Sequence, residues 1–124
     1  LGTWYVTSAG RMGLCDWGCV MKGNGARDFA YAVSATLEVQ DRRAWERDLL
    51  ALYLDRLRAA GGESVTFEVG FRRYRQQLFA ALLMWTPTLC HSPLLPDMQP
   101  EAVATEMIHR ISTAIGDLDA LDAF

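Results

Sequence analysis

Apolar residues recur at the three- and four-residue spacing of an amphipathic helix along most of the chain. The pattern covers four stretches, residues 26–37, 41–60, 66–85 and 100–118. The apolar positions predicted to face a common core are Phe29, Ala30, Val33 and Leu37; Trp45, Leu49, Leu52, Tyr53 and Leu57; Phe71, Tyr74, Leu78, Leu82 and Trp85; and Val103, Met107, Ile108, Ile111, Ala114, Ile115 and Leu118. Each stretch therefore predicts one helix that buries a single face.

Residue types at the ends of these stretches agree with helix boundaries. Asp41 and Thr66 can accept a hydrogen bond from the free amides of a first turn, so they are predicted as N-caps of the second and third helices. Gly61 follows the second stretch and can adopt the left-handed conformation that ends many helices. Pro87 is expected to stop the third helix, and Pro100 fits the first turn of the fourth.

The first part of the chain has a different pattern. Trp4–Thr7 and Met12–Cys15 are short apolar or β-favouring runs, and Gly10 between them permits a tight turn. They predict a β-hairpin, which must pack on something because two strands alone are marginally stable in water. Gly23-Asn24-Gly25 then breaks the chain before the first helix.

The predicted fold class is mainly α, with a short N-terminal β-hairpin followed by about four helices. Pro93 and Pro96 are expected to hold an extended link, and residues 117–124 are expected to fray. Nothing indicates a βαβ repeat, so a doubly wound sheet is not expected.

Composition narrows the class of protein. Of 124 residues, 51% are hydrophobic and 22% are charged, so residues 1–124 are expected to form a single domain. The net charge is −3 without a basic block, which argues against a nucleic-acid partner. Cys15, Cys19 and Cys90 lack zinc-type pairing and are expected to stay reduced. With no apolar run long enough for a bilayer, the sequence predicts a cytoplasmic protein without a membrane partner.

An acidic residue stands directly after the second predicted strand. Asp16 precedes Trp17, and Asp28 follows 12 residues later at the head of the first predicted helix. Mg²⁺ binds one or two carboxylates together with phosphate oxygens, so Asp16 is a candidate metal ligand in phosphoryl transfer. The alternative is an acid bonded to the amides of its own loop. Asp28 is predicted to be structural, because its carboxylate can cap the helix start.

Three segments carry a resemblance to a known family. They are Leu14-Cys15-Asp16-Trp17, Ala26-Arg27-Asp28-Phe29-Ala30-Tyr31 and Arg42-Arg43-Ala44-Trp45-Glu46-Arg47-Asp48-Leu49-Leu50-Ala51-Leu52-Tyr53. In this order they resemble the aminoglycoside phosphotransferase and choline-kinase-like superfamily, and more narrowly its "phosphotransferase enzyme family" and ecdysteroid-kinase-like members. In that family a hairpin leads to an Asp-Trp or Asp-Phe metal-binding motif, a glycine-containing loop and a helix that begins Asp-Leu-Ala.

The resemblance implies the C-terminal, helical lobe of a protein-kinase-like fold. Asp16 would bind Mg²⁺ and, through it, ATP, and Thr3 would stand where the family has an asparagine as its second metal ligand. Asp28 would match the structural aspartate. The implied cofactors are Mg²⁺ and ATP, and the implied substrate is a small molecule with a hydroxyl group.

The resemblance also implies parts that these residues are not expected to contain. The family's nucleotide-binding lobe and catalytic-base aspartate would lie before Leu1, so no catalytic residue is assigned and no kinase activity is expected from the chain alone. The alternative hypothesis is a non-catalytic, truncated kinase-like helical interaction module, which forms a homo-oligomer through exposed hairpin surface. His91 and His109 are expected to have structural or solvent-facing roles.

Overall fold

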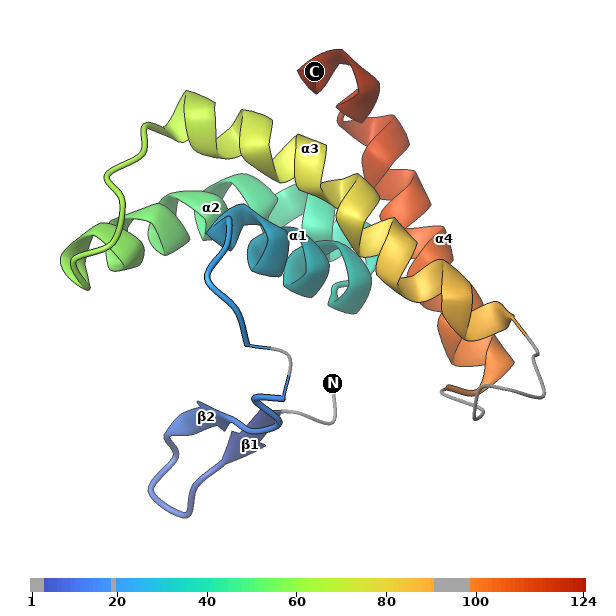
Figure 1. Ribbon diagram of the computed structural model, residues 1–124, viewed down its shortest axis with the longest axis horizontal. Helices are drawn as coiled ribbons and strands as arrows, with labels where there is room; N and C mark the ends of the chain where they lie inside the picture. The colour runs from blue at the N-terminus through green and yellow to red at the C-terminus, as the bar shows by residue number, and fades with distance from the viewer. Residues whose placement is uncertain (1–3, 19, 91–98) are drawn as a thin grey trace.

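The fold is seen in a computed structural model that describes residues 4–18, 20–90 and 99–124. In this part of the chain a β-hairpin precedes four α-helices, and the protein is 69% helical (Figure 1). The elements are β1 (Trp4–Val6), β2 (Met12–Leu14), α1 (Gly25–Thr36), α2 (Val39–Ala59), α3 (Phe67–Trp85), the 3₁₀ turn η1 (Thr86–Leu89), α4 (Glu101–Asp117) and the 3₁₀ turn η2 (Ala120–Ala123). The predicted fold class is confirmed. None of the described helices has the length and apolar character needed to cross a membrane.

Helix α3 lies at the centre of the helical part and packs against α1, α2 and α4. In Figure 1, α2 runs back along α1 and α3 returns along α2, so the short links join antiparallel neighbours. The side chains buried between these helices include Phe29, Ala30, Val33, Leu50, Tyr74, Leu78, Ile111 and Ala114. Most of the predicted core positions of α1, α3 and α4 are therefore confirmed, whereas Val103 is 39% exposed.

Helix α2 differs from its prediction. Trp45 and Leu52 are 50% and 52% exposed, although the apolar stripe placed them in the core. The fully buried positions of α2 are instead Arg42, Glu46 and Leu50. Two charged residues can occupy the buried face because they pair with each other there, so the true core face is shifted around the helix from the apolar stripe.

The start of α2 also differs. The helix begins at Val39, and Asp41 lies in its first turn and is not the cap. Glu38 holds the N-cap position but makes no side-chain capping bond, because its carboxylate pairs with Arg110 of α4. Arg110 also donates from Nη1 to the carbonyl of Thr36 at 3.0 Å. A tertiary contact therefore sets this boundary, which local residue preference could not reveal.

Other helix ends follow the prediction. The Thr66 hydroxyl accepts a hydrogen bond from the Val69 amide at 3.4 Å and caps α3. Gly61 takes φ +82° after α2, and the Gly62 amide donates to the Leu57 carbonyl at 2.9 Å. Pro100 was expected in the first turn of α4 and lies one position earlier, at the cap just before the helix.

The C-terminal tail is folded, contrary to the expectation that it frays. Asp119 takes φ +45°, and the chain turns there so that Ala120 and Ala123 are buried in η2. Gln76 of α3 donates to the Ala123 carbonyl at 2.7 Å, and Arg75 donates to the Asp119 carbonyl. These bonds from α3 satisfy backbone groups of the tail, which the sequence pattern did not indicate.

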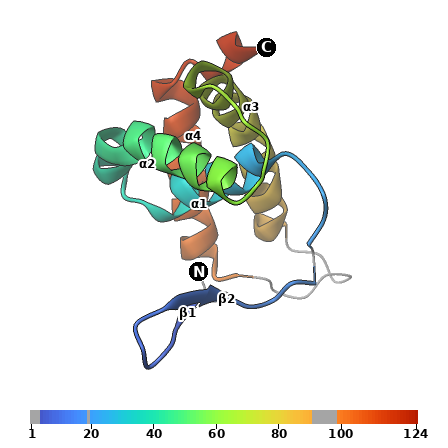
Figure 2. The ribbon, with the colours of Figure 1, turned by 90° about the vertical axis from the view of Figure 1, so that its left-hand side faces the viewer.

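The hairpin stands apart from the helices. Its register pairs Trp4 with Leu14 and Val6 with Met12, which places four apolar side chains on one face. All four are 39–66% exposed, and neither strand packs against any described helix. Figures 1 and 2 show the hairpin projecting beyond the helical part in both views. The sequence predicted that the hairpin packs against another surface. The described residues do not provide such a surface.

Candidate functional site

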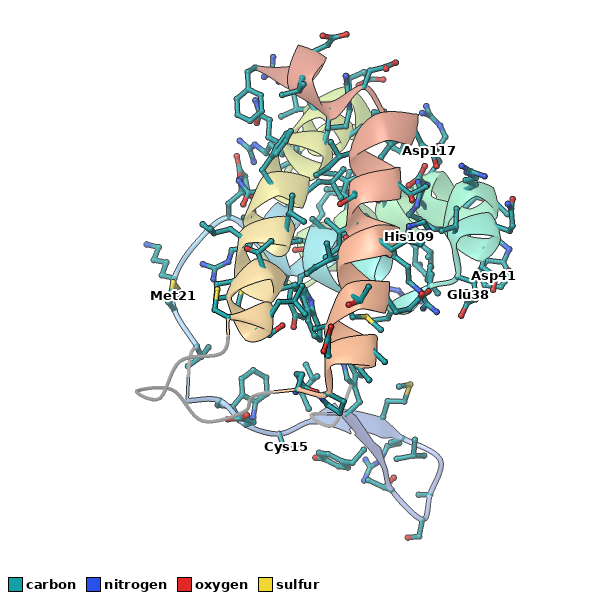
Figure 3. The ribbon with its side chains drawn as sticks, turned by 90° about the vertical axis from the view of Figure 1, so that its right-hand side faces the viewer. Cys15, Met21, Glu38, Asp41, His109 and Asp117 are labelled. Carbon is teal, nitrogen blue, oxygen red and sulfur yellow. The ribbon has the colours of Figure 1, made fainter. Side chains whose placement is uncertain are left out.

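Asp16 lies two residues after β2, where the chain leaves the hairpin toward α1. Its neighbour Cys15 lies on the same exit segment in Figure 3. Asp16 takes φ +62°, a left-handed conformation that aspartate tolerates better than most residues. Its side chain is exposed, and Oδ1 would lie 3.6 Å from a Cβ added to Gly18. The hairpin exit thus presents a carboxylate to solvent just beyond a strand end.

Asp28 lies exposed in the first turn of α1. The capping bond predicted for it is made instead by Asn24, whose Oδ1 accepts from the Ala26 amide at 3.1 Å. Asp28 still places negative charge at the positive end of α1, which favours the helix. Burial, together with the charge of Asp28, raises the pKa of the Tyr53 phenol above its usual range. The structural role assigned to Asp28 stays a prediction.

The described residues do not gather into a metal-binding cluster. They contain no group of three or more His, Cys, Asp or Glu side chains that could hold an ion. Thr3, the second predicted ligand, lies outside the described residues, as do Cys19 and His91. Asp16 fits Mg²⁺ as one hard oxygen ligand, since Mg²⁺ takes its remaining ligands from water and substrate phosphates.

A pocket of about 270 Å³ opens between the start of α1, the second half of α2 and the start of α3. Leu50, Leu54 and Leu57 form its apolar side. The paired side chains of Glu63 and Arg73, 2.8 Å apart, line it as well. Asp16 is not among the residues that line this pocket, so the pocket and the hairpin exit are separate features.

Glycines allow the close packing beside this pocket. A Cβ on Gly25 would lie 2.2 Å from the Tyr53 hydroxyl oxygen, and a Cβ on Gly70 would lie 2.7 Å from Leu54 Cδ1. Both distances are shorter than real Cβ contacts, so a side chain at either position would displace the end of the Tyr53 or the Leu54 side chain. From the sequence, Gly25 was predicted only to interrupt regular structure before the first helix. The pattern did not indicate this packing role.

A buried polar network was missed by the sequence interpretation. Arg42 Nη1 donates to Glu46 Oε2 at 2.8 Å, and the Tyr74 hydroxyl donates to the same oxygen at 3.0 Å. Arg42 also pairs with Asp117, to which Arg43 donates two bonds of 2.7 and 2.8 Å. Asp117 faces the start of α2 from the end of α4 (Figure 3). The four-residue spacing of Arg42 and Glu46 was the one available signal.

The network changes the acidity of its members. The Arg43 hydrogen bonds, with help from Arg42, hold the pKa of the Asp117 carboxyl below its usual value. Burial and the negative charge of Glu46 raise the pKa of the Tyr74 phenol far above its usual range. At neutral pH the Asp117 carboxyl therefore stays ionised and the Tyr74 phenol stays protonated, as their hydrogen bonds in the network require. The network connects α2, α3 and α4, and its role is therefore structural.

Comparisons with models of protein families, with curated proteins and with solved structures found no significant match. The resemblance to the aminoglycoside phosphotransferase and choline-kinase-like superfamily therefore rests on the motifs of the sequence alone. It stays a prediction.

Proposed function

We propose that the chain is the C-terminal helical part of an ATP-dependent phosphotransferase that transfers a phosphoryl group to the hydroxyl of a small molecule. One observation carries the proposal: an exposed carboxylate, Asp16, at the exit of a hairpin. It is followed in order by a glycine-containing loop, by Asp28 in the first turn of α1, and by the long helix α2. This is the order of elements on which the resemblance rests.

In this proposal Asp16 would hold Mg²⁺ with its carboxylate, and Thr3 would assist with its hydroxyl. Bound Mg²⁺ would neutralise negative charge on the phosphates of ATP, which is the main requirement of phosphoryl transfer. Asp28 would brace the start of α1 behind the exit segment. The nucleotide-binding lobe and the catalytic base would come from other parts of the same protein, so we expect the isolated chain to bind metal and nucleotide weakly and to transfer no phosphate.

An NMR titration tests the role of Asp16. Mg²⁺ and then Mg²⁺–ATP are added to millimolar concentration while backbone amide shifts are followed. We expect shifts centred on residues 14–18 that disappear in Asp16→Asn, a variant that also tolerates a left-handed conformation. Asp122→Asn in η2 is the matched control and should titrate like the wild type. If Asp16→Asn showed the same shifts as the wild type, or if the wild type showed no shifts near residue 16, Asp16 would not be a metal ligand.

Activity tests the proposal at the level of the whole protein. A protein that contains this chain together with a nucleotide-binding lobe should transfer labelled phosphate from ATP to small alcohols. Asp16→Asn should reduce this transfer to background, and Asp122→Asn should not. A protein that binds no nucleotide and phosphorylates no alcohol in a broad panel would contradict the proposal.

The alternative function, a non-catalytic interaction module, is favoured by one observation. The hairpin face formed by Trp4, Val6, Met12 and Leu14 is apolar, exposed and uncovered by the described helices. A second copy of the chain would cover it and form a dimer. Sedimentation should then show a dimer that Val6→Lys converts to a monomer, whereas Leu121→Lys in η2 leaves it intact. A wild-type monomer at high concentration would exclude this function.

A further inference from the structure

The guanidinium of Arg27 lies between two methionine sulfurs. Its Nη1 is 3.7 Å from the sulfur of Met21, and its Nη2 is 3.4 Å from the sulfur of Met84. Met21 lies on the segment that leads into α1 (Figure 3), and Met84 lies in the last turn of α3. The salt bridges formed among the described residues do not include Arg27. One cation therefore contacts thioethers from two segments that are distant in the sequence.

These contacts are weak, and their sulfur atoms are accessible. A thioether is a poor hydrogen-bond acceptor, whereas the oxygen of a sulfoxide is polar and accepts well. Met21 is 67% exposed and Met84 is 48% exposed, so an oxidant in solution can reach both. Oxidation at either sulfur would place a strong acceptor beside a charged donor that is already in position.

We propose that Met21 and Met84 form a peroxide-sensitive modification site, in which oxidation tightens the link that Arg27 makes between the segment before α1 and the end of α3. The inference does not depend on phosphoryl transfer, because it uses only the Arg27 contacts. Oxidation would therefore strengthen a contact at this site, whereas a sulfoxide usually disrupts apolar packing.

The chemical step is a two-electron oxygen transfer from hydrogen peroxide. The methionine sulfur attacks one peroxide oxygen, the O–O bond breaks, and the sulfur–oxygen bond of the sulfoxide forms. Sulfur is oxidised, and peroxide is reduced to water after a proton moves to the departing oxygen. Arg27 then donates to the sulfoxide oxygen in place of the sulfur, and it keeps its charge and both N–H donors.

The chain offers a single-site readout of this link. Lys22 lies directly after Met21 and is the only lysine among these 124 residues. A lysine-specific endoprotease therefore cuts the chain once, and the cleavage rate reports how often the segment before α1 opens. Stronger hydrogen bonds from Arg27 to Met21 hold this segment more firmly against α3, so oxidised protein should be cut more slowly.

The experiment compares cleavage rates before and after hydrogen peroxide treatment, with sulfoxides assigned by mass spectrometry. We expect oxidised wild type to be cut about fivefold more slowly, the effect of strengthening one hydrogen bond to a charged group by about 1 kcal/mol. Methionine sulfoxide reductases should restore the original rate. Cleavage that is unchanged or faster after oxidation of Met21 and Met84 would overturn the proposal.

Variants separate this link from general oxidation. Met12 is equally exposed, at 66%, but lies on the hairpin. A Met12→Leu, Met98→Leu protein should keep the full effect. Met21→Leu, Met84→Leu should lose it, and so should Arg27→Leu, in which both sulfurs remain but the donor is gone. Persistence of the effect in Arg27→Leu would contradict the assignment.

Discussion

At the scale of single residues, Arg42 shows how charge can be part of a core. It is 1% exposed, yet its guanidinium reaches two carboxylates, from Glu46 and Asp117. A buried charge is tolerated when partners satisfy it, and it is costly once a partner is removed. The sequence could not reveal this network, because Asp117 lies 75 residues from Arg42 along the chain.

Removing Arg42 should destabilise the protein strongly. Arg42→Ala leaves the buried Glu46 carboxylate without its cationic partner, and we expect the free energy of unfolding to fall by about 3–5 kcal/mol. Arg58→Ala is the control, because Arg58 and its partner Asp55 are 65% and 68% exposed and such pairs contribute about 1 kcal/mol or less. Urea denaturation at neutral pH measures both. Equal effects of the two substitutions would show that the Arg42 network does not support the core.

Asp117 predicts a pH dependence of stability. Its pKa is lower in the folded than in the unfolded protein, where it is near the ordinary value of 3.8. Its ion pairs therefore contribute fully above this value, and the contribution is lost as the pH falls through the folded pKa. Urea denaturation between pH 7 and pH 2.5 should show wild-type stability declining below about pH 4. Asp117→Asn should be less stable at pH 7 and decline less on acidification. Parallel pH profiles would refute this role.

At the scale of elements, α1, α3 and α4 were predictable because their apolar periodicity coincides with the face that packs. Phe29, Leu78 and Ile111 lie in the core where the spacing placed them. The interpretation of α2 was right only in part: Leu49 and Tyr53 pack against the core, but the fully buried positions carry charged residues and the apolar Trp45 faces solvent. Periodicity alone cannot show which of two faces meets the core when ion pairs compensate buried charge.

Two leucines of α2 test the corrected orientation. Leu50 is 1% exposed and Leu52 is 52% exposed, so the same substitution should have very different effects. Leu50→Ala should lower the free energy of unfolding by about 2–5 kcal/mol, because it leaves a cavity in the core. Leu52→Ala should change it by about 0.5 kcal/mol or less. Chemical denaturation gives both values. A larger effect at Leu52 would mean that the predicted apolar stripe, and not Leu50, faces the core.

At the scale of the whole molecule, the hairpin and the helical part are distinct in packing. The four-helix arrangement was predictable from sequence, but the separation of the hairpin was not, because its apolar residues gave the same signal as a core strand. The candidate site was predictable only as a residue at a strand end. Thr3, the second predicted ligand, lies outside the described residues, and no pattern in the chain specifies the other ligands.

Two glycines test this separation. Gly10 turns the hairpin at φ +73°, and Gly61 ends α2 at φ +82°. Valine at either position introduces strain of about 1–2 kcal/mol. Gly61→Val should lower the urea midpoint of the helical part, whereas Gly10→Val should disorder the hairpin amides in NMR spectra and leave that midpoint unchanged. A lower midpoint in Gly10→Val would mean that the hairpin supports the helices.

We propose that Asp16 binds a metal–nucleotide complex at the hairpin exit. Mn²⁺ replaces Mg²⁺ at oxygen ligands and broadens the NMR signals of nearby nuclei, so substoichiometric Mn²⁺–ATP tests it most directly. We expect broadening centred on residues 14–18 in the wild type, retained in Asp122→Asn and lost in Asp16→Asn. Broadening that spreads over the acidic surface equally in all three proteins would contradict it.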